Sequence, residues 1–413
     1  MMFLRKSSNV TQVLLRRCRV PARTAITFAP PPVDKPVGYW LLGCGGLVAG
    51  MVSVGGLTRL TRSGLSMTDW KLQGSLPPAT KEDWEAEFER YKQFPEWEQR
   101  KSMSLDEFKT IYWWEYGHRM FGRVVGVAFC APLVYFGMQG RLRGLEPRLA
   151  ALLGLGATQG LVGWWMVRSG LDESARASPR EIRVSPYRLA THLGLAFSTY
   201  SLLVWTSLDV LSPARPTAIP TALKPLAVAS ATLVFATALS GAFVAGNDAG
   251  RAFNTFPKMD GHWVPPDLLA LSPVYRNFGE NAATVQFDHR LLALASTCAV
   301  GALALAPKPA SLPPAFTLAS TAAGGLLLAQ VSLGVATLLL YVPVPLAATH
   351  QLGSLALLTA TLCAAHALKA TPGAYKITAS ALALALPLSA LTGLALDLPA
   401  SLPGGEHFWL GGC

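Results

Sequence analysis

Charged residues are scarce in this chain. Of its 413 residues, 14% are Asp, Glu, Lys or Arg and 51% are hydrophobic, and the mean hydropathy is +0.35. This balance argues against a water-soluble globular protein and favours a membrane protein. The net charge is +11, but the basic residues lie in the N-terminal tail and in loops and form no compact patch. The sequence therefore predicts no nucleic-acid partner; it favours a membrane surface or an organelle-targeting segment.

Closely spaced cysteine pairs are also missing. The six cysteines are scattered, and most lie in apolar stretches: Cys18, Cys44, Cys130, Cys298, Cys363 and Cys413. Without a CxxC or another close pair they indicate neither a disulfide framework nor a zinc site. We expect them to act as small buried hydrophobes.

Long apolar runs recur along the chain, and a helix needs about 20 such residues to cross a bilayer. Eight runs have this length: 37–57, 113–137, 148–167, 187–209, 223–246, 285–306, 315–341 and 345–368. We therefore predict an all-α polytopic protein with eight transmembrane helices in a lipid bilayer. A ninth run, 377–396, is apolar enough to span but carries Pro387, so its crossing stays open.

The N-terminal segment 1–36 is basic. Residues 1–33 contain six Lys or Arg and no acid, with Ser, Thr and Leu between them. A mitochondrial transit peptide followed by a matrix tail has this composition. The alternative is a basic cytoplasmic tail that obeys the positive-inside rule.

The eight spans divide into two sets of four that share short sequence motifs. Ala-Thr-His recurs at 190–192 and 348–350, and Gln-x-x-x-Gly recurs at 159–163 and 330–334. Such internal similarity indicates a tandem duplication. We predict an N-terminal four-helix bundle with a surface loop, a C-terminal four-helix bundle and a C-terminal extension, covering 37–210 (loop 58–112), 211–370 and 371–413.

Four histidines lie at repeat-equivalent positions near the starts of the second and fourth helix of each set: His118, His192, His289 and His350. The helices that carry them run in one direction, so the four imidazoles should share one layer near one membrane face. Three further histidines have no repeat counterpart and are expected at the surface or at helix ends: His262, His366 and His407.

Paired histidines on facing bundle helices suit axial ligation of heme iron. We predict one heme between His118 and His192 and another between His289 and His350. The neighbouring arginines are candidate partners for the heme propionates: Arg119, Arg123 and Arg290. Zinc or copper is the inorganic alternative, but no cysteine or carboxylate is repeated alongside the histidines.

The two halves differ three residues before the first histidine of each pair. Glu115 precedes His118, whereas Gln286 precedes His289. A buried carboxylate near a porphyrin is a candidate for acid–base chemistry. We therefore expect a reactive N-terminal pocket with Glu115 as its catalytic residue, and an electron-transfer site in the C-terminal half. The alternative for Glu115 is a salt bridge to Arg119 or to the interfacial loop.

Several motifs together carry a family resemblance: GGLTRLTRSGLSMTDW, EYGHRMFGR, THLGLAF, AGNDAGRAFNTFPKM, ENAATVQFDHR and ATHQLGSLALL. In this order and spacing, from about 37 to 370, the chain resembles heme A synthase of the mitochondrial type, a cytochrome c oxidase assembly family that oxidises heme O to heme A. The cysteine pair of some bacterial members is missing from residues 58–112.

The resemblance implies an eight-helix enzyme of the mitochondrial inner membrane whose sites face the intermembrane space. Residues matching His289 and His350 would ligate a heme b cofactor, and the substrate heme O would lie near His118 and His192. Glu115 would act in two successive oxidations of the ring methyl to a formyl group, with oxygen from water. The implied partners are heme O synthase, cytochrome c oxidase assembly factors and an unidentified electron acceptor or donor; a homo-oligomer is compatible with the sequence.

Two other functions fit the residues. A di-heme electron carrier would hold two equivalent hemes and would have no special need for Glu115. A heme transporter or assembly chaperone would hold porphyrin only transiently.

Overall fold

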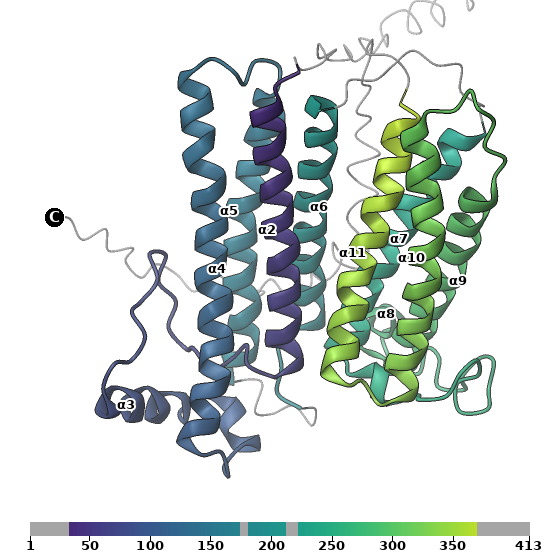
Figure 1. Ribbon diagram of the computed structural model, residues 1–413. Coiled ribbons are helices and arrows are strands. Elements are labelled where there is room, and N and C mark those ends of the chain that lie inside the picture. The colour runs from purple at the N-terminus through teal and green to yellow at the C-terminus, as the bar shows by residue number, and fades with distance from the viewer. Residues whose placement is uncertain (1–32, 174–180, 212–221, 370–413) are drawn as a thin grey trace, which may run out of the picture.

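The computed structural model describes residues 33–173, 181–211 and 222–369. Eight long helices stand side by side in it (Figure 1): α2 Lys35–Leu60, α4 Leu105–Met138, α5 Glu146–Leu171, α6 Pro186–Leu211, α7 Leu223–Gly246, α9 Ala282–Leu305, α10 Pro314–Leu339 and α11 Val344–Ala367. All eight are long and apolar enough to cross a membrane, which confirms the predicted class. The expected transit peptide and ninth apolar run lie outside the described residues.

The helices form two groups of four. α2 packs against α4 and α6, and α5 packs against α6; in the second group α7, α9, α10 and α11 pack in a closed ring. The helices α2, α6, α7 and α11 make the contacts between the groups, and Figure 1 shows the two groups next to each other. This arrangement supports the proposed duplication.

Helix α4 begins earlier than the sequence predicts, at Leu105 and not near residue 113. Ser104 caps the helix: its hydroxyl accepts from the Glu107 amide while the Glu107 carboxylate accepts from the Ser104 amide at 2.7 Å, a capping box. The added turns bury Phe108 against α3 (Lys81–Tyr91), which lies in the surface loop. Glu115 consequently lies about three turns inside α4.

Short elements complete the end of the molecule that carries α3. The 3₁₀ helix η1, Pro95–Gln99, follows α3 in the first long loop. The second long loop follows α7 and contains η3 Ala249–Arg251, η4 Val274–Arg276 and α8 Asn277–Glu280. We refer to this end of the helices as the loop end.

A buried ionic cluster joins the two groups at the opposite end. The Asp209 carboxylate, 1% exposed, lies 2.6 Å from Arg148 of α5 and 2.8 Å from His366 of α11, and it also pairs with Lys369. His366, expected at the surface or at a helix end, lies at the end of α11 but is buried. One acid thus holds basic groups from both halves.

Replacing Asp209 with alanine should destabilise the protein by about 3–5 kcal/mol, because it removes the buried carboxylate that pairs with Arg148 and Lys369 and bonds His366. Thermal unfolding of the purified protein in detergent measures the loss. Asp106→Ala is the control, since that side chain is 90% exposed. Equal melting temperatures for the two variants would contradict the prediction.

Candidate active site

The structure brings together the histidines of each predicted pair. His118 of α4 and His192 of α6 are close enough to interact electrostatically, as are His289 of α9 and His350 of α11. His192, His289 and His350 lie within about two turns of their helix starts, toward the loop end. His118 lies farther along its helix because α4 begins earlier.

Each histidine ring rests against a glycine of a neighbouring helix. A side-chain carbon built on any of these glycines would lie 2.8–3.3 Å from the ring, so a larger residue would displace the imidazole. The contacts join Gly55 of α2 to His118, Gly163 of α5 to His192, Gly241 of α7 to His289, and Gly334 of α10 to His350. The repeat is therefore preserved at the level of single contacts.

Two glutamines hold the backbone at the second histidine of each pair. The Gln159 amide donates to the His192 carbonyl at 3.0 Å, and the Gln330 amide donates to the His350 carbonyl at 3.0 Å. A mid-helix carbonyl already accepts its helical bond, so this added donor restrains the turn that carries the histidine. The repeated Gln-x-x-x-Gly text was the sequence signal for these contacts, and our reading of the sequence used it only as evidence of duplication.

The donor set fits an axially ligated heme better than a compact metal site. Nδ1 of His192 and Nδ1 of His350 are buried without a hydrogen-bond partner among the described residues, and Nε2 of His192 lies 3.4 Å from the Gln159 amide nitrogen. Among the described residues no three or more His, Cys, Asp or Glu side chains gather as a metal-binding group. A tetrahedral zinc site needs four ligands, whereas axial ligation needs one or two imidazoles.

Glu115 is buried beside the loop that follows α2. Its carboxylate accepts from Arg119 at 2.6 Å, from the Ser66 hydroxyl at 2.8 Å and from the Met67 amide at 2.9 Å. The salt bridge to Arg119 that the sequence left open is therefore present. These donors fix the carboxylate in one place, one turn from His118 along α4.

Gln286 occupies the matching place in the second half. Its side-chain oxygen accepts from Arg290 at 2.8 Å, just as Glu115 accepts from Arg119, but its amide donates to the Ala249 carbonyl at 2.6 Å. The two settings thus share an arginine and differ in chemistry. Of these two side chains, only Glu115 is ionisable.

The arginines near the histidines hold the loops that follow the first helix of each half. Arg119 donates to the carbonyls of Met67 and Asp69, both at 2.7 Å. Arg290 donates to the carbonyls of Phe253 and Thr255. Their role as propionate partners stays a prediction.

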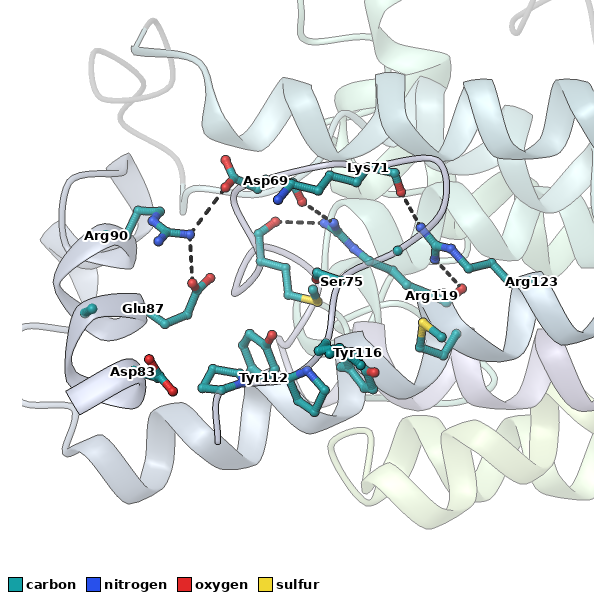
Figure 2. A pocket seen from close by; sticks show the side chains of 17 residues that line it. Asp69, Lys71, Ser75, Asp83, Glu87, Arg90, Tyr112, Tyr116, Arg119 and Arg123 are labelled. Carbon is teal, nitrogen blue, oxygen red and sulfur yellow. Dashed lines mark hydrogen bonds and ion pairs between the residues drawn. The ribbon is translucent and has the colours of Figure 1, made fainter. Parts of the chain in front are cut away.

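A polar cavity of about 380 Å³ opens between that first loop, α3 and α4. Figure 2 shows Arg119 and Arg123 along one side of it and Tyr112 and Tyr116 along another. Arg123 donates to the Leu72 carbonyl at 3.0 Å, so this arginine too holds the loop.

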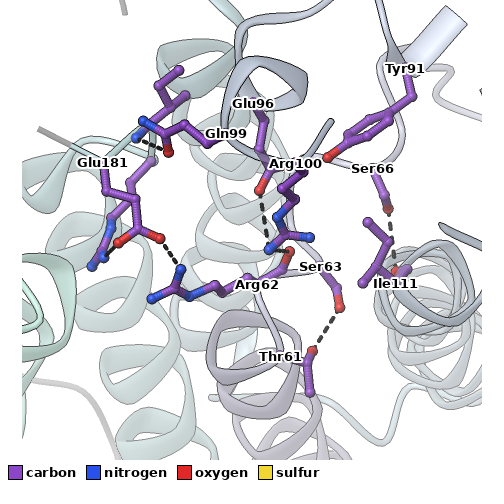
Figure 3. A network of polar contacts seen from close by, with 12 residues as sticks. Thr61, Arg62, Ser63, Ser66, Tyr91, Glu96, Gln99, Arg100, Ile111 and Glu181 are labelled. Carbon is purple, nitrogen blue, oxygen red and sulfur yellow. Dashed lines mark hydrogen bonds and ion pairs between the residues drawn. The ribbon is translucent and has the colours of Figure 1, made fainter. Parts of the chain in front are cut away.

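Another buried acid, Glu96, lies in η1 outside the membrane-spanning segments. It accepts from the Tyr91 hydroxyl at 3.1 Å and lies 3.6 Å from Arg100, which donates in turn to the Arg62 carbonyl (Figure 3). Burial raises the pKa of Glu96 to about 7, against the lowering effect of Arg100. The many charged residues near Glu96 in the sequence did not indicate that this acid would be buried.

Stability should fall with rising pH through the titration of Glu96. The folded protein holds this proton more tightly than the unfolded chain, so its contribution is complete below the ordinary pKa of 4.5 and is lost as the pH rises through about 7. Glu96→Gln should flatten the dependence of melting temperature on pH between those values. Glu89→Gln, at an exposed acid, should leave the slope unchanged; an unchanged slope in Glu96→Gln would contradict the assignment.

The fold and the site define a polytopic helical membrane protein with two repeated histidine-pair sites. The chain belongs to the COX15-CtaA family, described as cytochrome oxidase assembly protein, whose family model matches residues 38–362.

Relatives from animals, plants and bacteria share most of the chain. Heme A synthase COX15 of Bos taurus is 49% identical over 372 residues, which cover 88% of this chain and 89% of the relative. Heme A synthase COX15 of Arabidopsis thaliana is 49% identical over 349 residues, covering 82% and 76%. Heme A synthase of Nitrosospira multiformis is 47% identical over 356 residues, covering 85% and 97%.

Proposed function

We propose that this protein is a heme A synthase, an oxidoreductase that converts the ring methyl group of heme O to the formyl group of heme A. Two relatives that align with this chain over 89% and 97% of their own length are named heme A synthase. In this proposal the substrate lies between His118 and His192, and a heme b cofactor lies between His289 and His350. The formyl oxygen comes from water, and the electrons leave in two successive oxidations.

The difference between Glu115 and Gln286 carries the proposal. Both side chains lie one turn before a histidine and both contact an arginine four residues on, so position alone does not distinguish the halves. Only the carboxylate can take up a proton or stabilise positive charge that develops on the substrate. Glu115 therefore acts in the N-terminal half, and the C-terminal half exchanges electrons.

The packing of the helices supports the same division. In the C-terminal group α9 packs along α10, whereas the corresponding helices of the N-terminal group, α4 and α5, hardly touch. A substrate must enter and leave, while a cofactor stays. The loosely packed helices α4 and α5 suit the first task, and the closely packed helices α9 and α10 suit the second.

The resident heme b supplies one-electron chemistry when it is bound. The chain contributes position: His289 and His350 present imidazoles from facing helices, and Gly241 and Gly334 leave room for the rings. In the N-terminal half, the Ser66 hydroxyl and the Met67 amide donate to the Glu115 carboxylate and hold it in place. Arg119 offsets the cost of burying its charge.

We place the protein in the mitochondrial inner membrane with both sites toward the intermembrane space, in keeping with its basic N-terminal segment and its eight spans. Heme O synthase would supply the substrate, cytochrome c oxidase assembly would take the product, and a separate carrier would accept the electrons. An equivalent di-heme carrier is less well supported, because its two sites would need neither the Glu115 difference nor the looser packing of α4 against α5.

Glu115→Gln should abolish most heme A formation, by about 100-fold or more, because an amide cannot act as the proton acceptor. The measurement is chromatography of extracted hemes after expression beside a heme O synthase in a host without heme A. Asp106→Asn makes the same carboxylate-to-amide change on the exposed start of α4 and should have no effect. Normal heme A levels with Glu115→Gln would refute the proposed role.

The two histidine pairs should separate binding from chemistry. His289→Ala or His350→Ala should remove the resident heme b from the purified protein, since each removes an axial ligand. His118→Ala should keep heme b yet make no heme A. Absorption spectra of the reduced proteins report the first effect, with His262→Ala in an exposed loop as control; loss of heme b in His118→Ala would contradict the division.

A further inference from the structure

One histidine of the four has a hydrogen-bonded partner on its ring Nδ1. The Ser240 hydroxyl of α7 lies 2.7 Å from Nδ1 of His289, and the same hydroxyl donates to the Thr237 carbonyl at 2.7 Å. A serine hydroxyl has a single proton. When Nε2 of His289 ligates iron, Nδ1 carries the ring proton, so the Ser240 oxygen accepts from Nδ1–H while the hydroxyl proton goes to the Thr237 carbonyl.

The other three rings lack this partner. Nδ1 of His192 and Nδ1 of His350 are buried and unpaired, and His118 makes no hydrogen bond to the described part of the chain. His118 is the informative case, because it occupies the repeat position of His289. The residue at the repeat position of Ser240 has no polar side chain, and His118 turns Nε2 and Cδ2 toward α2 where His289 turns Cε1 and Nδ1 toward α7.

The loop contacts fix that correspondence. Arg119 reaches the carbonyls of Met67 and Asp69, and Arg290 reaches those of Phe253 and Thr255. Met67 therefore corresponds to Phe253, and Asp69 to Thr255. The same spacing along the first helix of each half makes Gly55 correspond to Gly241 and Val54 correspond to Ser240. The two aligned glycines are those that touch His118 and His289. Valine has no group that could bond an imidazole.

We propose that Ser240 is a positioning residue that fixes the tautomer and the orientation of His289 as a ligand of the resident heme, and that Val54 leaves His118 without this restraint. The inference rests on the proposed function and adds to it a cause for the different behaviour of the two hemes. A hydrogen bond to the outer nitrogen of a ligating histidine raises its basicity and holds its ring. Ser240 thereby favours ferric iron and slow heme loss in the C-terminal half.

The test uses the full chain purified in detergent with its bound heme b. Ser240→Ala should raise the midpoint potential in a redox titration, alter the low-spin ferric signal in electron paramagnetic resonance, and release heme to apomyoglobin about 10-fold faster. Ser240→Thr keeps the hydroxyl and should restore all three values. Ser230→Ala is the matched control on the same helix, because the Ser230 hydroxyl donates to the Leu226 carbonyl and has no other hydrogen-bond partner among the described residues.

The possible outcomes distinguish a failure of the Ser240 role from a failure of the proposed function. If the wild-type protein holds heme b through His289 and His350, but Ser240→Ala leaves the potential, the signal and the release rate unchanged, the role of Ser240 is refuted and the proposed function stands. If the wild-type protein binds no heme b there, both fail. Should Ser240→Ala not accumulate, Ser240→Cys, with its weaker acceptor, should shift the potential in the same direction by less; an unshifted potential would again refute the role.

Discussion

The close approach of histidine rings to glycines is the constraint on which the site depends. An imidazole inside a bilayer must face the bundle interior, and the helices here leave space for it only where the facing residue has no side chain. Because the four contacts fall on α2, α5, α7 and α10, each half needs all four of its helices to build one site: two carry the histidines and two carry the glycines. The four-helix half is in this sense the smallest unit that holds one pair, and the duplicated fold holds two.

The proposed difference in function coincides with the places where the two four-helix halves differ. The arginine bonds at Glu115 and Gln286 are alike, and so are the glutamine bonds at His192 and His350. Against this common background a carboxylate replaces an amide, valine replaces serine, and α4 and α5 pack more loosely than α9 and α10. All three differences agree with the proposed division, in which the N-terminal half is the more reactive and less permanent holder of a porphyrin.

Much of this architecture follows from the sequence, because apolar runs long enough to cross a bilayer and repeated short motifs can both be recognised in the sequence itself. The eight spans and the membership of each histidine pair are of this kind. The early start of α4 depends on a cap at Ser104 that hydropathy does not register, although Ser-x-x-Glu is visible in the text. The glycine contacts, the Ser240 bond and the Asp209 cluster join residues that are distant along the chain, so no local pattern could indicate them. Glu96 is the clearest case: a charged neighbourhood predicts solvent, and tertiary packing buries it.

A contact between α2 and α11 joins the two histidine pairs. Gln351, next to His350, donates to the Val52 carbonyl of α2 at 3.0 Å, and its side chain lies against Gly56, where any side-chain carbon would overlap it. Gly55, the neighbour of Gly56, is the residue that supports His118. A turn of α2 therefore touches the first pair on one side and the second pair's helix on the other. Because a packed interior shifts between discrete arrangements and does not deform smoothly, this turn and α11 set the relative position of the two sites, as an electron path between a changing substrate heme and a fixed cofactor heme would require.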